Sequence, residues 1–395
     1  MNYDVVVSGA GPAGSRCAEI LARNGFNVAL IERDITWRKP CGGGLSTRVM
    51  SKYYPQIRKL NPVSKKGAFM FSADFHKIEY NWEDYGEDSV VMDRLELDNL
   101  MRDIAVEAGA ELFDKNTSFD FIIKNQKKIG VKTKTKSGIK EYLGKIIVIA
   151  DGMSSKLAVR SGLRERWKIE NIGLAKCSII EGKTDFDETK SYIYFRPYKG
   201  YGWVFPIDNN QINIGCGTFE EDNLNYNLNE IYDDFINNPN IKQYFSGSNY
   251  KNKWTGAFPI PAKGVLEKSL YGDNIMIVGD AAGFVSPISG EGVHPSIVSG
   301  QVAAETAIKA IDEDDISKKS LKSYKQHPNI KKIIRNFKLK RSMVGFFYEN
   351  QGKNLDIMFK LAEADDDFKT QVINMFFSNA TPSNEFISKI RSSST

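Results

Sequence analysis

The N-terminal stretch YDVVVSGAGPAGSRCAEILARNGFNVALIER constrains the fold more than any other part of the chain. The apolar residues 5–7 predict a buried parallel strand, and Pro12 suits the first turn of the helix that follows. Between them stand Gly9, Gly11 and Gly14, which allow a tight turn, close approach of a pyrophosphate and close packing of helix on strand. The stretch therefore predicts the first βαβ unit of a dinucleotide-binding sheet.

Glu32 ends the next predicted strand, 23 residues after Gly9. An acid at this place can accept hydrogen bonds from ribose hydroxyls and disfavours a phosphate on that ribose, so the site suits FAD or NAD and not NADP. A glycine turn without a ligand is the alternative. It is disfavoured because strand, helix and acid occur together.

Two further segments resemble the remaining FAD fingerprints of the group-A flavin monooxygenases and related reductases. In VIADGMSSKLAVR, Asp151-Gly152 follows a buried strand. In NIMIVGDAAGFVSPISGEGVHPSIVSG, Gly279-Asp280 follows another strand and a glycine-containing loop precedes a helix. In that family the second aspartate binds the ribityl chain, and the dipole of the following helix stabilises the anionic reduced flavin. The alternative is that Asp151 and Asp280 are ordinary acidic residues of turns. The order of the three motifs along the chain disfavours it.

Two more motifs narrow the resemblance to the geranylgeranyl reductases, which hydrogenate isolated isoprenoid double bonds with reduced FAD. RKPCGGGLS follows the second strand, and PYKGYGWVFP contains the Y-x-W-x-F-P pattern of that family. The family has two residues between the first proline and the tyrosine, whereas this chain has three after Pro197, so Pro197 is not counted as matched. The archaeal digeranylgeranylglycerophospholipid reductases are the members that the chain resembles.

The aromatic strand has a chemical use in such a reaction. An unactivated alkene accepts hydride only if a proton reaches its other carbon, which gives the transition state cationic character. Tyr201, Trp203 and Phe205 alternate and therefore share one strand face, where their rings can stabilise positive charge and line a tunnel for the lipid. Pro206 is counted with them as substrate-binding. An aromatic core strand is the alternative.

Cys41 and His294 are candidates with weaker arguments. Cys41 matches the cysteine of the CGGG motif and is a candidate proton donor or redox-sensitive gate, whereas a free cysteine is more often a small packing residue. His294 lies in the loop expected near the flavin and can move a proton, whereas a lone histidine is more often structural. With Tyr201 and Trp203 they complete the predicted catalytic set, and no metal site is expected.

The predicted cofactor-binding residues come from the three fingerprints, from the glycine loop and from residues beside them. They are Gly9, Gly11, Ala13, Gly14, Glu32, Arg33, Cys41, Gly42, Gly43, Arg94, Asp151, Gly152, Gly279, Asp280, Pro287, Gly290, Gly292 and Val293.

The predicted fold is α/β, with a Rossmann-type FAD-binding domain like that of p-hydroxybenzoate hydroxylase. We expect this domain to be discontinuous, over residues 1–65, 90–165 and 263–310. A β-rich substrate-binding domain is expected over 66–89 and 166–262, and a C-terminal helical region over 311–395. That region contains a basic stretch, residues 331–341, directly before the apolar run MVGFF. A solvated helix face is the favoured interpretation, and a peripheral membrane contact is the alternative.

Composition and net charge exclude few classes of protein. The chain has 41% hydrophobic residues, a net charge of +5 and no basic cluster of the nucleic-acid-binding kind. It shows no signal peptide and no run of the roughly 18–20 apolar residues that span a bilayer, so a cytoplasmic location is expected, with peripheral attachment at the inner face of the membrane as the alternative. A monomer is expected. The expected substrate is a polyprenyl lipid. NAD(P)H and ferredoxin both stay open as the electron donor.

Two other functions share these motifs. A flavin monooxygenase or halogenase of the same fold would act on a small hydrophobic or aromatic substrate and consume oxygen. A non-catalytic lipid-binding flavoprotein would keep the tunnel and the FAD without turnover.

Overall fold

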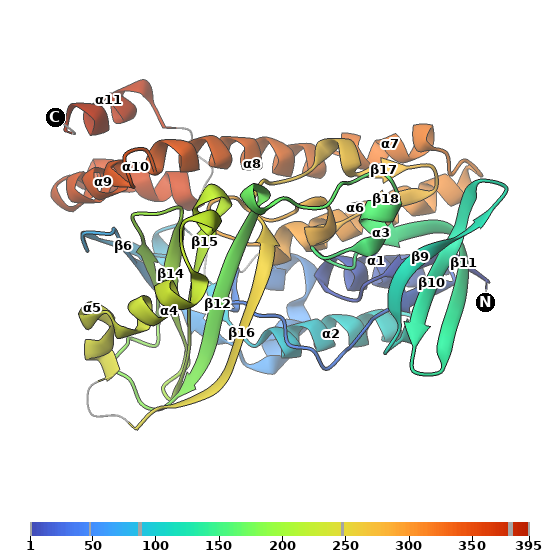
Figure 1. Cartoon of the computed structure of the whole chain (residues 1–395), viewed down its shortest axis with the longest axis horizontal. Coiled ribbons are helices and arrows are strands. Elements are labelled where there is room, and N and C mark those ends of the chain that lie inside the picture. Colours follow the sequence, from blue (N-terminus) through green and yellow to red (C-terminus); the bar gives the residue numbers. More distant parts are fainter. Residues whose placement is uncertain (1, 47–48, 86–88, 246–248, 378–381, 394–395) are drawn as a thin grey trace. The chain divides into compact units, whose positions relative to one another are not determined.

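The computed structural model describes residues 2–46, 49–85, 89–245, 249–377 and 382–393, which form two compact units (Figure 1). Each unit is assembled from segments far apart in the sequence. The first comprises residues 1–38, 95–167 and 261–337, and the second comprises 39–94, 168–260 and 338–395.

The first unit is built on a sheet of eight strands, whose central five are parallel. The apolar residues 5–7 are fully buried in β1, as a strand covered on both faces requires. An antiparallel ribbon, β9 with β10, extends the sheet from β11 (Figure 1). In sheet order the strands are β17 (Tyr271–Gly272), β18 (Ile275–Ile277), β11 (Gly138–Ile149), β1 (Asn2–Ser8), β2 (Val28–Ile31) and β8 (Glu111–Phe113), with β10 (Lys127–Thr135) and β9 (Thr117–Lys124) branching off β11.

Two helices of the first unit pack against each other through small residues. A Cβ on Gly300 of α6 would lie 2.0 Å from the carbonyl oxygen of Ala13 in α1, so only glycine allows this approach. The helices of this unit are α1 (Pro12–Arg23), α2 (Arg94–Glu107), α3 (Lys156–Arg160), α6 (Val293–Asp312) and α7 (Lys318–Gln326), with the short helices η7 (Glu267–Ser269) and η8 (Gly279–Ala282).

The second unit contains a seven-stranded sheet and a small three-stranded one. One face of the large sheet is closed by an aromatic core in which Tyr194, Val204 and Phe235 are almost fully buried. In sheet order the strands are β16 (Lys251–Pro261), β12 (Ile172–Glu181), β15 (Gln211–Phe219), β14 (Gly200–Asp208), β13 (Lys190–Phe195), β5 (Gly67–Phe71) and β6 (Lys77–Asn81); the small sheet has β3 (Gly44–Ser46), β7 (Ser89–Val91) and β4 (Val63–Lys65).

Helices cover the large sheet of the second unit. The helix α4 supplies Phe235 to the aromatic core, and the C-terminal helices α9, α10 and α11 follow one another at the end of the chain (Figure 1). The helix α8 (Pro328–Phe347) begins in the first unit and ends in the second. The others are α4 (Leu228–Asn237), α5 (Pro239–Lys242), α9 (Lys353–Ala364), α10 (Asp366–Phe377) and α11 (Asn384–Ser392), with the short helices η1 (Val49–Tyr53), η2 (Pro55–Leu60), η3 (Glu83–Tyr85), η4 (Ile169–Asn171), η5 (Glu220–Leu224) and η6 (Gln243–Phe245).

The predicted fold class, an FAD-binding α/β fold with a β-rich part and C-terminal helices, is confirmed. The unit boundaries differ from the predicted domains, because residues 39–65 group with the seven-stranded sheet and residues 311–337 group with the eight-stranded one. Among the described residues, no helix is both long and apolar enough to cross a membrane. Which unit binds cofactor and which binds substrate stays a prediction.

Two helical glycines offer a matched test of this packing. Gly300→Ala should lower the free energy of unfolding by about 1–3 kcal/mol, because the new methyl meets the rigid backbone of α1. Gly345→Ala in α8 should raise it by about 0.5–1 kcal/mol, since no heavy atom lies within 4 Å of the added Cβ. Urea denaturation of both variants measures the difference. Equal effects of the two substitutions contradict the packing argument.

Candidate functional site

The glycine turn of the first unit lies between β1 and α1. A Cβ on Gly9, whose φ is +103°, would lie 2.4 Å from the carbonyl oxygen of Ala150 at the end of β11. A Cβ on Gly14 would lie 1.8 Å from the Gly9 carbonyl oxygen. A Cβ on Gly11 meets no heavy atom within 4 Å. Two glycines thus permit close backbone packing, and the third leaves open space at the N-terminus of α1, which suits an anionic pyrophosphate.

Glu32 is held beside this turn at the end of β2. Its carboxylate accepts hydrogen bonds from the backbone N–H groups of Ala10 at 2.8 Å, Arg33 at 2.8 Å and Asp34 at 3.2 Å. The Arg33 guanidinium lies 4.5 Å from the ring centroid of Trp37, which is partly exposed. Glu32, the acid predicted to bind the ribose, is therefore fixed in position by the glycine turn and by the loop after β2.

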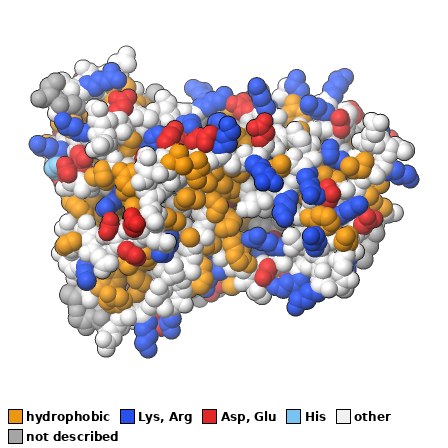
Figure 2. All heavy atoms as spheres, viewed as in Figure 1, with side chains coloured by type: hydrophobic (Ala, Val, Ile, Leu, Met, Phe, Trp, Pro, Cys, Tyr) orange, Lys and Arg blue, Asp and Glu red, His pale blue; other side chains and the backbone are white. Residues whose placement is uncertain are grey.

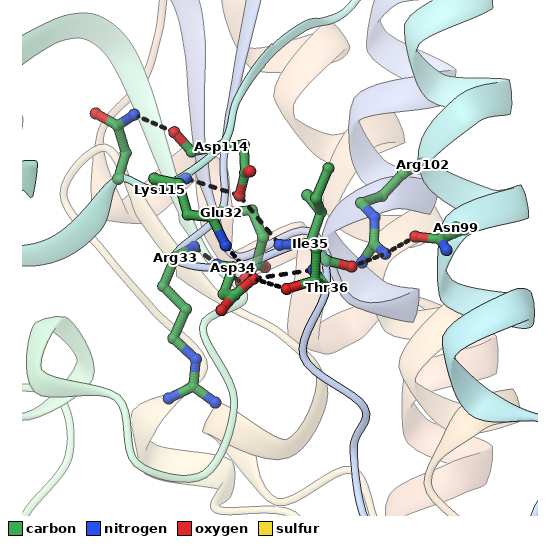
Figure 3. A network of polar contacts seen from close by, with 10 residues as sticks. Glu32, Arg33, Asp34, Ile35, Thr36, Asn99, Arg102, Asp114 and Lys115 are labelled. Carbon is green, nitrogen blue, oxygen red and sulfur yellow. Dashed lines mark hydrogen bonds and ion pairs between the residues drawn. The ribbon is translucent and has the colours of Figure 1, made fainter.

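A polar network holds the loop after β2 in place (Figure 3). Asp34 accepts hydrogen bonds from the backbone and the hydroxyl of Thr36 and forms an ion pair with Lys115. These contacts hold the pKa of the Asp34 carboxyl below its usual range. Asp114 accepts a hydrogen bond of 3.0 Å from the backbone N–H of Ile35. Figure 3 shows these side chains converging on the segment that carries Glu32.

Arg102 is a buried charge that sequence reasoning missed. Its guanidinium donates to the carbonyl oxygen of Ile35 at 3.0 Å, contacts that of Ala10 at 3.5 Å and hydrogen-bonds the side chain of Asn99 (Figure 3). It ties the glycine turn to the loop after β2 and places a positive charge close to both. Its place within an ordinary helical pattern gave no signal, because its partners are backbone groups of distant segments.

Asp151 stands at the end of β11, next to the glycine turn. Its Oδ1 atom is buried and makes no hydrogen bond with the described residues. Burial raises the pKa of the Asp151 carboxyl to about 7, and nearby Glu32 adds to this effect against the opposing charge of Arg164. Gly152 follows with a φ of +76° and open space where a Cβ would stand. A hydroxyl group of a ligand placed in the space beside Gly152 could donate the missing hydrogen bond to Asp151 Oδ1.

The third fingerprint forms a tight loop before α6. The Gly279 backbone N–H donates to the Ser299 hydroxyl at 3.0 Å, and Asp280 is buried. A Cβ on Gly292 would lie 3.3 Å from Asp280 Oδ1, so this glycine keeps the helix start close to the aspartate. Val293 begins α6, and His294 follows, partly exposed. Pro287 is buried and Gly290 has a φ of +64°.

These features of the first unit fit FAD. The chain offers open space at the start of α1, two carboxylates at the ends of the strands that flank β1, and an orphaned acceptor on one of them. Of the other predicted cofactor residues, Ala13 packs in the contact between α1 and α6. Cys41, Gly42, Gly43 and Arg94 lie in the second unit, so their role toward FAD stays a prediction.

In the second unit, the aromatic residues of β14 share one face as predicted. The ring centroids of Tyr201 and Trp203 lie 5.9 Å apart, and those of Trp203 and Phe205 lie 6.4 Å apart. A Cβ on Gly215 of β15, which pairs with Trp203, would lie 2.3 Å from the indole ring. The glycine therefore lets the indole lie flat across the neighbouring strand. Pro206 points to the opposite face, where it pairs with Ile212 of the aromatic core, so the structure separates it from the other three.

The CGGG loop packs directly on these rings. A Cβ on Gly42 would lie 2.8 Å from the Phe205 ring and 3.0 Å from Trp203 Nε1. Gly43 has a φ of +81°, and its Cβ would lie 2.3 Å from the carbonyl oxygen of Met92. Without side chains, the loop lets its backbone lie against planar rings, and these rings belong to the chain itself.

Asn213 joins the two motifs and was also missed. Its side chain accepts a hydrogen bond from Trp203 Nε1 at 2.9 Å and donates one to the carbonyl oxygen of Cys41 at 2.9 Å. It is almost fully buried. The signal was present in QINIGCG, where Asn213 is a polar residue at a buried position that alternates with Gly215 and Gly217.

Cys41 is partly buried, and its carbonyl oxygen also lies 3.9 Å from the thiol of Cys177. Cys17, Cys177 and Cys216 are buried.

Pro197 is the proline that the extra residue separates from the family's spacing. It lies exposed between β13 and β14, whereas the neighbouring Tyr198 enters the aromatic core. The extra residue is therefore absorbed in the turn and leaves the alternation of Tyr201, Trp203 and Phe205 intact.

The C-terminal helices reach the strand next to the aromatic face. Phe195 of β13 pairs with Tyr201, and its ring lies 5.2 Å from that of Phe376 and 5.7 Å from that of Phe359. The Tyr348 hydroxyl donates to the carbonyl oxygen of Gly200 at 2.7 Å. The tail thus packs beside the predicted substrate wall.

Comparisons with known proteins agree with this site. A family model for the FAD binding domain matches residues 2–331. Digeranylgeranylglycerophospholipid reductase 1 of Methanopyrus kandleri is 31% identical over 332 residues, which cover 82% of this chain and 85% of the relative. A geranylgeranyl bacteriochlorophyll reductase-like protein of Thermoplasma acidophilum, solved by crystallography, shares 25% identity and a TM-score of 0.76, covering 98% of this chain and 95% of that one.

A flavin-dependent brominase has a TM-score of 0.72 at 18% identity, covering 100% of this chain and 98% of the brominase, which shows a shared fold alone. The chain is therefore an FAD-binding oxidoreductase. It belongs to the geranylgeranyl reductase family, which confirms the resemblance found in its CGGG and Y-x-W-x-F-P motifs.

The raised pKa of Asp151 has a measurable consequence. Below about pH 4 the carboxyl is protonated in both the folded and the unfolded chain; between about 4 and 7 only the unfolded chain ionises, so stability falls as pH rises. At pH 8 the free energy of unfolding of Asp151→Asn should therefore exceed that of the wild type by a few kcal/mol, and the gap should close toward pH 4. Denaturation of FAD-free protein across this range measures it. Parallel pH profiles contradict the burial argument.

Proposed function

We propose that this protein reduces isolated C=C bonds of geranylgeranyl chains on archaeal-type membrane lipids or their precursors. The observation that carries the proposal is the contact of the CGGG loop with Trp203 and Phe205. Two motifs about 160 residues apart in the sequence form one surface there, and both are motifs of the family to which the chain belongs. The named activity of the Methanopyrus relative supports the lipid class.

When bound and reduced, FAD supplies a hydride, and a proton must reach the other carbon of the double bond. The chain's own contribution is a surface of three aromatic rings with little polar character, which excludes water from a polyprenyl chain and turns ring faces toward a cationic carbon. Asn213 holds the indole by its N–H, so its ring orientation is fixed before substrate binds. Cys41 and His294 are the proposed sources of the proton.

The remaining assignments belong to the same proposal. The predicted FAD-binding residues of the first unit hold the cofactor, and the β-rich second unit holds the lipid. NAD(P)H or ferredoxin supplies the electrons, and the protein acts as a monomer. The absence of a second glycine fingerprint in the sequence does not decide the donor.

Anaerobic turnover tests the reaction type. The protein is reduced with dithionite, mixed with detergent-dispersed digeranylgeranylglycerophospholipid and analysed by mass spectrometry. The lipid should gain mass in units of two hydrogens while the flavin is reoxidised. A product that forms only with stoichiometric oxygen would identify a monooxygenase or halogenase. Flavin that no prenyl lipid reoxidises would identify a non-catalytic carrier, and either result overturns the proposal.

The aromatic face can be tested separately. Trp203→Leu should lower kcat by at least tenfold with a much smaller change in lipid Kd, because a ring face helps the transition state more than the ground state. Trp203→Phe keeps a ring and should retain most of kcat. Asn213→Leu, which removes the hydrogen bond to the indole, should fall between them. Equal losses of kcat and lipid affinity in Trp203→Leu contradict the cation-stabilising role.

A further inference from the structure

The antiparallel ribbon of the first unit carries an unusual charge. Residues 117–145, which we name the basic arm, span β9, β10 and the first part of β11. They contain eight lysines and two acidic residues, a net charge of +6. Because the whole chain carries +5, all other residues together carry −1. The arm alone therefore carries more net positive charge than the whole chain.

Little of this charge is neutralised within the protein. The two acids of the arm are engaged, Asp120 with Arg160 at 2.8 Å and Glu141 with Lys132 at 3.7 Å. Lys145 pairs with Asp4. Five other lysines are exposed and form no ion pair with the described residues: Lys124, Lys127, Lys134, Lys136 and Lys140. They flank the two turns of the arm, at opposite ends of β10.

The arm also exposes large apolar side chains beside these lysines. Ile123 is 64% exposed next to the first turn, and Ile139 is 63% exposed next to the second. Among the described large hydrophobic residues only Leu224 is more exposed. In Figure 2, hydrophobic side chains lie between Lys and Arg side chains toward the right-hand end, the end that carries this ribbon in Figure 1. Exposed aliphatic groups among cations match an anionic lipid surface, because the aliphatic groups leave water and the cations are attracted to the headgroups.

The other basic segment, in α8, lacks this combination. It carries six cations and no acid over residues 328–347. Its apolar residues Met343, Val344 and Phe347 are buried, and Arg341 pairs with Glu220 at 2.7 Å. This agrees with a solvated helix face packed on the protein, the interpretation favoured from the sequence. Basic charge alone therefore does not distinguish the arm; charge together with exposed isoleucines does.

We propose that the basic arm docks the protein on the surface of an anionic lipid bilayer. Each lysine near such a surface strengthens binding about fivefold, and the isoleucines at the two turns enter the headgroup region. The choice of a bilayer over an acidic protein rests on the exposed isoleucines and, in part, on the proposed function, since a membrane lipid must be reached where it resides. Docking through the arm would bring the enzyme to that surface without a membrane span.

Vesicle flotation tests the arm. Wild-type holoenzyme is mixed with vesicles of phosphatidylcholine containing about 30% phosphatidylglycerol, or of phosphatidylcholine alone, at about 0.1 M and about 0.5 M salt. It should float with the anionic vesicles at low salt and be released at high salt. The triple variant Lys127→Gln, Lys136→Gln, Lys140→Gln should bind on the order of 100-fold more weakly. Ile123→Ser with Ile139→Ser should bind at least tenfold more weakly.

A matched control removes three cations of α8, Lys331→Gln, Lys332→Gln and Arg335→Gln, and should change flotation by less than threefold. Reduction of detergent-dispersed lipid should be unchanged in all three variants, which keeps a failure of docking distinguishable from a failure of the proposed reaction. The proposal is overturned if the wild type does not float with anionic vesicles. It is also overturned if the α8 control loses as much binding as the arm variant. Arm-dependent binding of a small acidic iron–sulfur protein without flotation would assign the arm to a protein partner and also overturns it.

Discussion

The close approach between the glycine turn and the end of β11 is the constraint on which the first unit depends. Gly9 leaves no room for a side chain against the Ala150 carbonyl, and Gly14 leaves none against Gly9 itself. These contacts bring the start of α1, the end of β2 and the end of β11 to one edge of the parallel sheet, where ligands of open α/β sheets bind. Glu32 lies close enough there for its negative charge to raise the pKa of Asp151.

The second unit uses glycine in a different way. Gly42 and Gly215 lie against the indole of Trp203 from two separate segments, so backbone packs on the ring at both places. A substituent on either glycine would have to displace an aromatic ring. The aromatic face and the glycine loop therefore depend on each other, and Asn213 fixes their register through one hydrogen bond to each. This mutual dependence explains why the two motifs are informative as a pair.

Local patterns predicted much of this structure, and contacts between distant segments account for the rest. The strand, turn and helix around Gly9 and the alternation of Tyr201, Trp203 and Phe205 are set within a few residues, so the sequence was sufficient. Pro206 was placed with the aromatic residues because it is next to them in the motif, although the period of a strand puts it on the other face. Arg102 and Asn213 were missed because each joins segments that only the fold brings together. The compact units divide at residue 38 and not at 65, because Cys41 and Gly42 contact strands that come much later in the chain.

The two carboxylates at the sheet edge show how the site and its ligand depend on each other. Asp151 keeps a buried oxygen without a hydrogen bond from the described residues, beside Glu32, whose negative charge makes ionisation of Asp151 harder. Both features lower the stability of the folded chain. Hydroxyl groups of FAD would donate to these oxygens, and the N-terminus of α1 would receive the pyrophosphate, so cofactor binding and stability of the first unit are coupled. Asp151 and Glu32, which lower the stability of the folded chain, are thus the residues expected to bind the cofactor. A binding site can retain such polar groups because its ligand supplies the hydrogen bonds that the protein lacks.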